Sequence, residues 1–151
     1  MSWNRGRGGR CEPARFARLL FRSELWLRAR LMPLQVHGRS LKQALELAEP
    51  SAGRCRFAGL SAAYVVRAVR RTARRPWAMR DRRCLREGLL AYLFLAEAGL
   101  GPRLHFGVRP DALTTEHIAA HCWVTLDGST VIGESEPSYV EILVHPADTA
   151  A

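Results

Sequence analysis

The chain has 151 residues, a length that predicts a single domain with a sizeable hydrophobic core. Hydrophobic residues make up 48% of it and charged residues 25%, a balance that excludes an extensively disordered protein. The net charge of +9 hides an asymmetry, since residues 1–87 carry 21 basic and 6 acidic groups whereas residues 88–151 carry 2 basic and 8 acidic groups.

The chain is predicted to begin with a basic tail followed by a long helix. Residues 1–10 are rich in arginine and glycine, a composition typical of a disordered segment. From about Glu12 to Leu31, large apolar residues recur at helical spacing, and Pro33 is expected to end the helix. The residues that define this periodicity are Phe16, Leu19, Leu20, Leu27 and Leu31.

Two further helices are predicted next. Ser40 is a suitable N-cap for a short amphipathic helix that Pro50 stops. A third helix is expected from about Ala58 to Arg74, where a following proline breaks it. Its expected apolar side holds Leu60, Tyr64, Ala68 and Val69, and its polar side holds Arg67, Arg70, Arg71 and Arg74.

A fourth helix and an antiparallel sheet complete the predicted order. The helix is expected from about Arg82 to Ala98, with Asp81 as N-cap and Gly99 just past its C-terminal end. The apolar period then changes to two, and Asp127-Gly128 predicts a tight hairpin. Helices followed by strands predict an α+β fold in one compact domain, with a helical region at 11–80 and a core at 81–146. The expected strands are 103–108, 120–126, 130–133 and 139–144.

Cys84 is the first residue with a pattern that suggests chemistry. It stands near the start of the fourth helix, where backbone N–H groups lack intrahelical partners and the helix dipole is positive. Three arginines nearby add positive charge, so we expect the thiolate to be favoured. Gly88, one turn on, leaves room for a facing strand. The alternative is an inert buried cysteine. The arginines are Arg82, Arg83 and Arg86.

His121 is the candidate partner for Cys84. It lies on a predicted strand, where alternation places His121, Trp123 and Thr125 on one face and Cys122 on the other. A helix-entrance cysteine and a strand histidine form a workable thiolate–imidazolium pair. His105 and His145 are expected to be strand-face or surface residues, and Cys11 and Cys55 to be incidental.

These segments resemble a known family. Residues 82–99, which begin Arg-Arg-Cys-Leu-Arg and close with a glycine, resemble the nucleophile helix of the transglutaminase-like lasso-peptide maturation proteases. Leu104–Arg109 and the sequence His121-Cys122-Trp123-Val124 with its Asp-Gly turn resemble the strands that follow in that family. The resemblance extends over about residues 57–136. It departs at Cys122, where the family often has alanine.

The resemblance implies a Cys-His-acid triad on a papain/transglutaminase-like core. The implied reaction is hydrolysis of a peptide bond through a thioester, with a lasso-peptide precursor as substrate. The implied partners are the precursor peptide, a separate leader-recognition protein and a macrolactam synthetase. No cofactor is expected, because the chain has no phosphate-binding glycine loop. We expect a cytoplasmic protein, since no secretory signal or transmembrane run stands out.

The third triad member is open between two acidic residues, with an amide or backbone acceptor as the remaining alternative. Asp127 stands in the hairpin turn, where its carboxylate would bond local backbone N–H groups. Continued pairing from a two-residue turn places Glu134 opposite His121, within side-chain reach. The sequence therefore favours Glu134. It also departs from the family here, because the family's usual offset for the acid falls on Gly133.

Three other interpretations fit parts of the sequence. A zinc site would need His117 with His121 and Cys122, but the two neighbours point to opposite faces. A non-catalytic adaptor would use the arginine helices to bind an acidic peptide or nucleic acid, although no nucleic-acid motif is present. The third is acyl transfer on the same fold, since water and an amine compete for one thioester.

Overall fold

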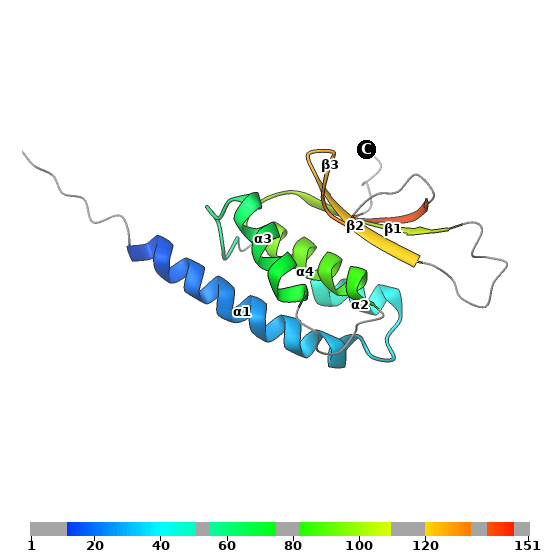
Figure 1. Ribbon diagram of the computed structural model, residues 1–151, viewed down its shortest axis with the longest axis horizontal. Coiled ribbons are helices and arrows are strands. Elements are labelled where there is room, and N and C mark those ends of the chain that lie inside the picture. Colours follow the sequence, from blue (N-terminus) through cyan, green and yellow to red (C-terminus); the bar gives the residue numbers. More distant parts are fainter. Residues whose placement is uncertain (1–11, 51–54, 75–81, 110–119, 134–138, 147–151) are drawn as a thin grey trace, which may run out of the picture.

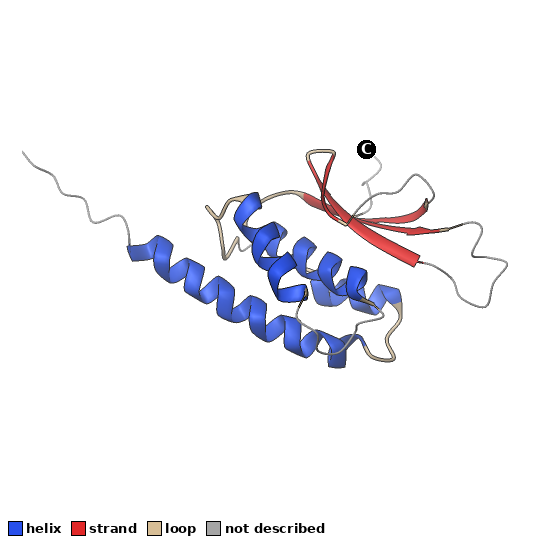
Figure 2. Cartoon of the chain, in the orientation of Figure 1, coloured by secondary structure: helices blue, strands red, loops and turns tan. Residues whose placement is uncertain are grey.

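The structure is a computed structural model that describes residues 12–50, 55–74, 82–109, 120–133 and 139–146. Within these ranges, four helices precede a four-stranded antiparallel sheet, so the predicted α+β class is confirmed (Figure 2). The helices are α1 (Glu12–Val36), α2 (Leu41–Ala48), α3 (Ala62–Ala73) and α4 (Arg83–Glu97). The strands are β1 (Pro102–Val108), β2 (Ala120–Leu126), β3 (Ser129–Ile132) and β4 (Val140–His145), in the order β3-β2-β1-β4.

Helix α4 is the centre of the molecule. Figure 1 shows the helices on one face of the sheet, with α4 near the strands and α1 farthest from them. Residues 88–95 of α4 are all buried, because strands cover one side of the helix and helices the other. Phe21 of α1 packs edge-on against Phe94 of α4, with ring centroids 5.2 Å apart. The central position of α4 fixes the place of its first turn, which carries Cys84.

Helix α1 is longer than predicted, because Pro33 does not end it. The helix continues to Val36, and the N–H of His37 still donates to the carbonyl oxygen of Pro33. Proline removes one hydrogen bond, but its fixed φ is compatible with a helix. Burial of Met32 and Val36, which are 4% and 3% exposed, stabilises the last turn around it.

The buried face of α1 is also not the stripe that defined its periodicity. Phe16, Leu20 and Leu27 are exposed, and the same holds for the other residues of that stripe. The core receives the opposite face, and Phe21 contacts the ring of Phe57 as well. This helix has two apolar stripes, and spacing alone does not say which one faces the core. The buried residues are Phe21, Leu25, Ala29, Met32 and Val36.

Caps set the starts of the next two helices. Ser40 and Gln43 form a reciprocal capping box at the start of α2, as the predicted cap requires. Helix α3 begins at Ala62 instead of Ala58, because the hydroxyl of Ser61 accepts from the N–H of Tyr64. Its fully buried residues are Val65, Val69 and Ala73, so of the expected apolar side only Val69 is fully buried.

The two ends of α4 differ in how closely they follow the prediction. Gly99 has φ of 79°, the left-handed conformation that ends many helices. At the other end the N-cap is Arg82, with no side-chain cap hydrogen bond. The expected N-cap, Asp81, lies outside the described residues, as does the predicted tail at residues 1–10.

The β2–β3 hairpin follows the predicted register only near its turn. Asp127 and Gly128 both have positive φ, as a two-residue turn of this kind requires. Thr125 pairs with Thr130, but Val124 pairs with Ile132, so a β-bulge shifts the register by one residue. The pairing expected between His121 and Glu134 assumed no bulge. That assumption is wrong from Val124 onward.

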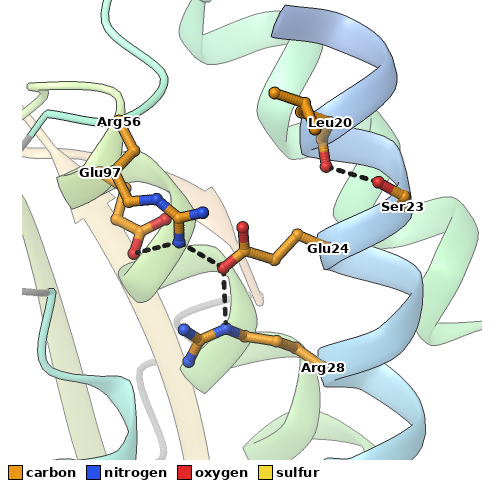
Figure 3. Close-up of polar contacts among 6 residues, drawn as sticks. All are labelled: Leu20, Ser23, Glu24, Arg28, Arg56 and Glu97. Carbon is orange, nitrogen blue, oxygen red and sulfur yellow. Dashed lines mark hydrogen bonds and ion pairs between the residues drawn. The ribbon is translucent and has the colours of Figure 1, made fainter.

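A charged cluster joins α1 to the end of α4 (Figure 3). Glu24 accepts from Arg28 at 3.2 Å and from Arg56 at 2.6 Å, and Arg56 lies 3.9 Å from Glu97. Glu97 is fully buried. Burial, followed by the charge of Glu24, raises the pKa of the Glu97 carboxyl. The charges of Arg56 and Arg28 oppose that rise. The cluster ties the outermost helix to the central one.

Candidate active site

Cys84 is the second residue of α4, so its place at a helix entrance is confirmed. It is partly exposed, and its backbone N–H belongs to the first turn, where no intrahelical acceptor exists. Gly88 lies one turn further along the helix. A Cβ atom added there would stand 2.8 Å from the Sγ of Cys122 and 3.1 Å from a methyl carbon of Leu104. The close approach of a strand to this face of the helix therefore requires glycine.

The strand that approaches is β2, and Cys122 makes the contact. Its thiol donates a hydrogen bond to the backbone carbonyl oxygen of Cys84, with Sγ and O 2.9 Å apart. The two thiol groups are hydrogen-bonding partners as well. Because Cys122 has a single thiol proton, it donates to the carbonyl oxygen or, when Cys84 is ionised, to the thiolate. Sequence analysis placed Cys122 away from the site and missed this contact.

The surroundings of Cys84 favour its thiolate. The hydrogen bond from Cys122 is the largest cause, followed by burial, which opposes it, and then by the hydrogen bond and positive charge of His121. Together they lower the pKa of Cys84 to about 5. The hydrogen bond with Cys84, then burial and then the charge of Cys84 raise the pKa of Cys122 well above its ordinary value.

Two of the three arginines expected to lower the pKa of Cys84 have other partners, while Arg82 lines the same pocket as Cys84. Arg86 is buried and donates to the carbonyl oxygen of Ala73, at the end of α3. Arg83 is 3.9 Å from Glu87. The activation predicted from arginine charge is therefore supplied instead by Cys122 and His121.

His121 is held by aromatic rings on β2 and beside β4. Its ring stacks on Trp123, with centroids 6.2 Å apart and planes at 20°, and it packs against Tyr139 at 5.1 Å. In the sheet it pairs with Gly107, where a Cβ would stand 3.0 Å from the Trp123 ring. Glycine at this position leaves room for the ring that supports the histidine. Sequence analysis missed Gly107 and Tyr139, because only the strand register brings them to His121.

A second histidine stands behind this stack. The ring of His105 lies parallel to Trp123, with centroids 5.4 Å apart and planes at 6°. Its Nδ1 is 2.6 Å from a carboxylate oxygen of Glu141, and its Nε2 is 2.8 Å from the hydroxyl of Thr125. His105 is a strand-face residue, as expected, and it fixes the far side of Trp123.

A pocket of about 590 Å³ opens between the start of α4 and the sheet. Cys84, His121 and Cys122 all line it, so the structure brings the two predicted residues together with a third. Further walls come from the N-cap residue of α4, from β1 and from β4, through Arg82, Phe106 and Ile142. The partly exposed thiol of Cys84 is therefore open to solvent through this pocket.

The acidic member of the proposed triad is not decided by the described residues. Glu134 lies outside them and stays a prediction. Asp127 is exposed in the β2–β3 turn and does not line the pocket. The described residues contain no group of three or more His, Cys, Asp or Glu side chains arranged to hold a metal ion. His117, which the zinc interpretation needs, lies outside the described ranges.

The comparisons with known proteins identify the family. The family model of the transglutaminase-like superfamily matches residues 19–144, from α1 into β4. The chain belongs to the transglutaminase-like superfamily. Neither the search of curated proteins nor the search of solved structures returned a match. This superfamily includes cysteine proteases and transglutaminases.

Within the described part of the chain, no helix combines the length and the apolar character that crossing a membrane requires.

Cys84 is expected to be the most reactive thiol of the protein near pH 6. A pKa of about 5 leaves it mostly ionised there, whereas an ordinary thiol is almost entirely protonated. A thiolate of low pKa is intrinsically less nucleophilic than one of ordinary pKa. We therefore expect Cys84 to be alkylated only about tenfold faster than exposed Cys55 at pH 6. Alkylation followed by peptide mass mapping between pH 5 and 9 measures it. Equal rates for the two thiols at pH 6 would contradict the activation argument.

Proposed function

We propose that this protein is a cysteine peptidase that removes the leader from a lasso-peptide precursor. The observation that carries the proposal is the thiol of Cys84, which meets His121 at the wall of an open pocket and has a pKa lowered to about 5. Residues 82–99 and 121–124 resemble the lasso-peptide maturation proteases, and this resemblance supports a lasso-peptide precursor as the substrate. The reaction suits the cytoplasm, where free thiols persist.

The proposed reaction has two halves. The Cys84 thiolate attacks the scissile carbonyl, and His121 gives its proton to the departing amine, which leaves a thioester. Water then attacks the thioester, with His121 taking a proton and returning it to the Cys84 sulfur. Backbone N–H groups of the first turn of α4 have no intrahelical acceptor, so they are suited to stabilise the oxyanion.

Acyl transfer is the second candidate, because the same thioester accepts an amine. The test incubates the purified protein with the precursor peptide encoded by a neighbouring gene and follows the products by mass spectrometry. Hydrolysis predicts a free leader carboxylate even when excess glycine amide is present. A product carrying the amine would instead assign the protein to acyl transfer.

Glu134 is predicted to orient His121, and Asp127 is its competitor. Glu134→Gln should lower the cleavage rate by on the order of a hundredfold or more while leaving thermal stability nearly unchanged, because it replaces the charged acceptor for the imidazole by a neutral amide of the same size. Asp127→Asn should act mainly on stability, since Asp127 is exposed in the turn. Rates of precursor cleavage and melting temperatures of both variants show which of the two residues orients His121. Loss of activity in the Asp127 variant alone would reverse the assignment.

The arginine-rich helices are proposed to bind the precursor or its recognition protein. A groove of about 390 Å³ between α1 and α3 is lined by Arg22, Arg67 and Arg71 with the rings of Trp26 and Tyr64, and its lining contains no acidic residue. Arg86 bonds the end of α3, which forms one wall of this groove, to the first turns of α4. An acidic peptide segment fits such a groove.

Binding should therefore weaken as salt rises. The Debye length falls from ~10 Å at 0.1 M to ~3 Å at 1 M, so we expect the dissociation constant to rise by about tenfold or more. Fluorescence anisotropy with labelled precursor and the non-cleaving Cys84→Ala variant measures it. Arg67→Gln with Arg71→Gln should remove most of the salt dependence, whereas Arg39→Gln, after α1, should not. A dissociation constant that does not change with salt concentration would refute the electrostatic argument.

A non-catalytic adaptor remains the alternative from another functional class, and the same groove is the observation in its favour. An adaptor would bind the precursor equally well with or without the Cys84 thiol and would release no leader. Cleavage that depends on Cys84 separates the two functions.

A further inference from the structure

We propose that Cys84 and Cys122 form an oxidation site at which a hydroperoxide converts the two thiols into an intramolecular disulfide. Cys122 acts as the resolving cysteine for Cys84. This inference does not rest on peptide cleavage, because it concerns only the two sulfur atoms and can be read without a peptide substrate.

The contact between the two residues carries the proposal. The Sγ of Cys122 lies 2.9 Å from the backbone oxygen of Cys84, and the two thiol groups are hydrogen-bonding partners. Gly88 is the reason they meet, since a side chain there would displace the Cys122 sulfur. A resolving cysteine must already lie beside the reactive one, and here the packing of α4 against β2 places it there.

Access and ionisation favour the first step at Cys84 and not at Cys122. Cys84 lines the open pocket and is partly exposed, whereas Cys122 is only 2% exposed. The thiolate, which the surroundings favour at Cys84, is the form that peroxides oxidise. Cys84 is therefore the residue that a hydroperoxide meets first.

The chemistry balances in two steps. The Cys84 thiolate attacks the O–O bond of the hydroperoxide, takes one oxygen as a sulfenic acid and releases an alkoxide or hydroxide, which picks up a proton. The Cys122 sulfur then attacks the Cys84 sulfur, and the thiol proton leaves with the displaced hydroxide as water. The two thiols lose two electrons in total, and the peroxide gains them. A small thiol reductant reverses the reaction by exchange.

The raised pKa of Cys122 does not block the second step. The hydrogen bond and the charge of ionised Cys84 are two of its three largest causes. Both disappear when Cys84 becomes a neutral sulfenic acid, so only burial and the charge of Glu87 continue to disfavour the Cys122 thiolate. Oxidation of the first cysteine thus activates the second.

The experiment uses the full chain with Cys11→Ala and Cys55→Ala, so that only the pair remains. After treatment with hydrogen peroxide and alkylation, intact mass should show the loss of two hydrogen atoms and no added alkyl group. Peptide mapping should link the segments that hold Cys84 and Cys122. Dithiothreitol should then restore full alkylation of Cys84.

Cys122→Ala supplies the matched variant, and alanine is the residue that the resembling family often has at this position. In it, peroxide should carry Cys84 to the sulfinic acid, and dithiothreitol should not restore alkylation. Cys122→Ser provides the same test if the alanine variant is unfolded by circular dichroism. Sulfinic acid at Cys84 while Cys122 is present, a disulfide between two chains, or no reaction with peroxide would each overturn the proposal.

Discussion

Replacement of Cys84 by alanine is expected to abolish release of the leader from the precursor peptide. The thiolate is the proposed nucleophile, and the other described thiol that lines the pocket, Cys122, is only 2% exposed, so the loss should be on the order of 10⁴-fold or greater. The fold should survive, because Cys84 is partly exposed and alanine is well accepted in a helix. Mass spectrometry of the precursor with and without the variant measures the effect.

Two comparisons make this result specific to the thiol. Cys55→Ala removes an exposed cysteine and should cleave at the rate of the unaltered protein. Circular dichroism should give the Cys84→Ala variant the same spectrum and a similar melting temperature. A folded Cys84→Ala protein that still cleaves at the normal rate would exclude the peptidase mechanism proposed for this site.

Gly88→Val is expected to have the largest effect on stability. A Cβ at this position would lie 2.8 Å from the Cys122 sulfur and 3.1 Å from a methyl carbon of Leu104, and both residues are buried. Helix α4 would have to move away from β2, which should lower the free energy of unfolding by about 3 kcal/mol. Cleavage should fall too, because the same movement separates Cys84 from His121. Urea denaturation and the precursor assay measure the two effects.

A double-mutant cycle identifies the atom responsible. Gly88→Ala should lower the free energy of unfolding by less when Cys122→Ala is also present, because the sulfur that the new methyl group contacts is then absent. We expect a coupling free energy of about 1 kcal/mol between the two substitutions. Gly101→Val is the control, since no atom lies within 4 Å of its Cβ position, and it should stay within about 0.5 kcal/mol of the unaltered protein. Equal costs at Gly88 and Gly101 would show that helix–strand contact at Gly88 is not tight.

Part of the site was predictable because it depends on short-range features. Cys84 stands a few residues after a helix start, and His121 stands on a strand that a strong turn signal delimits. Both follow from local chain chemistry, and the structure brings both to one pocket. Cys122 was not predictable in the same way. Strand alternation predicts that Cys122 lies on the face of β2 opposite to His121. Only the packing of α4 against β2 shows that this face also contacts Cys84.

The positions of charged and aromatic groups also needed the folded chain. Arg86 follows Cys84 closely in sequence, but its guanidinium is buried against α3 and does not act on the thiol. His105 is sixteen positions from His121, yet both stack on Trp123 because β1 and β2 pair in that register. Proximity in sequence is a poor guide to electrostatic contact, since side chains turn toward whatever the tertiary structure places beside them.

By itself the sequence determined the element order, the α+β class, the hairpin at Asp127-Gly128 and the helix end at Gly99. These depend on caps, turns and periodicity, which act within a few residues of the chain. The tertiary structure decided which apolar stripe of α1 enters the core, where a bulge shifts β2 against β3, and that Cys122 touches Cys84. Each of these is a choice between locally equivalent arrangements. Only the burial of surfaces that are far apart in sequence makes one of them lower in free energy.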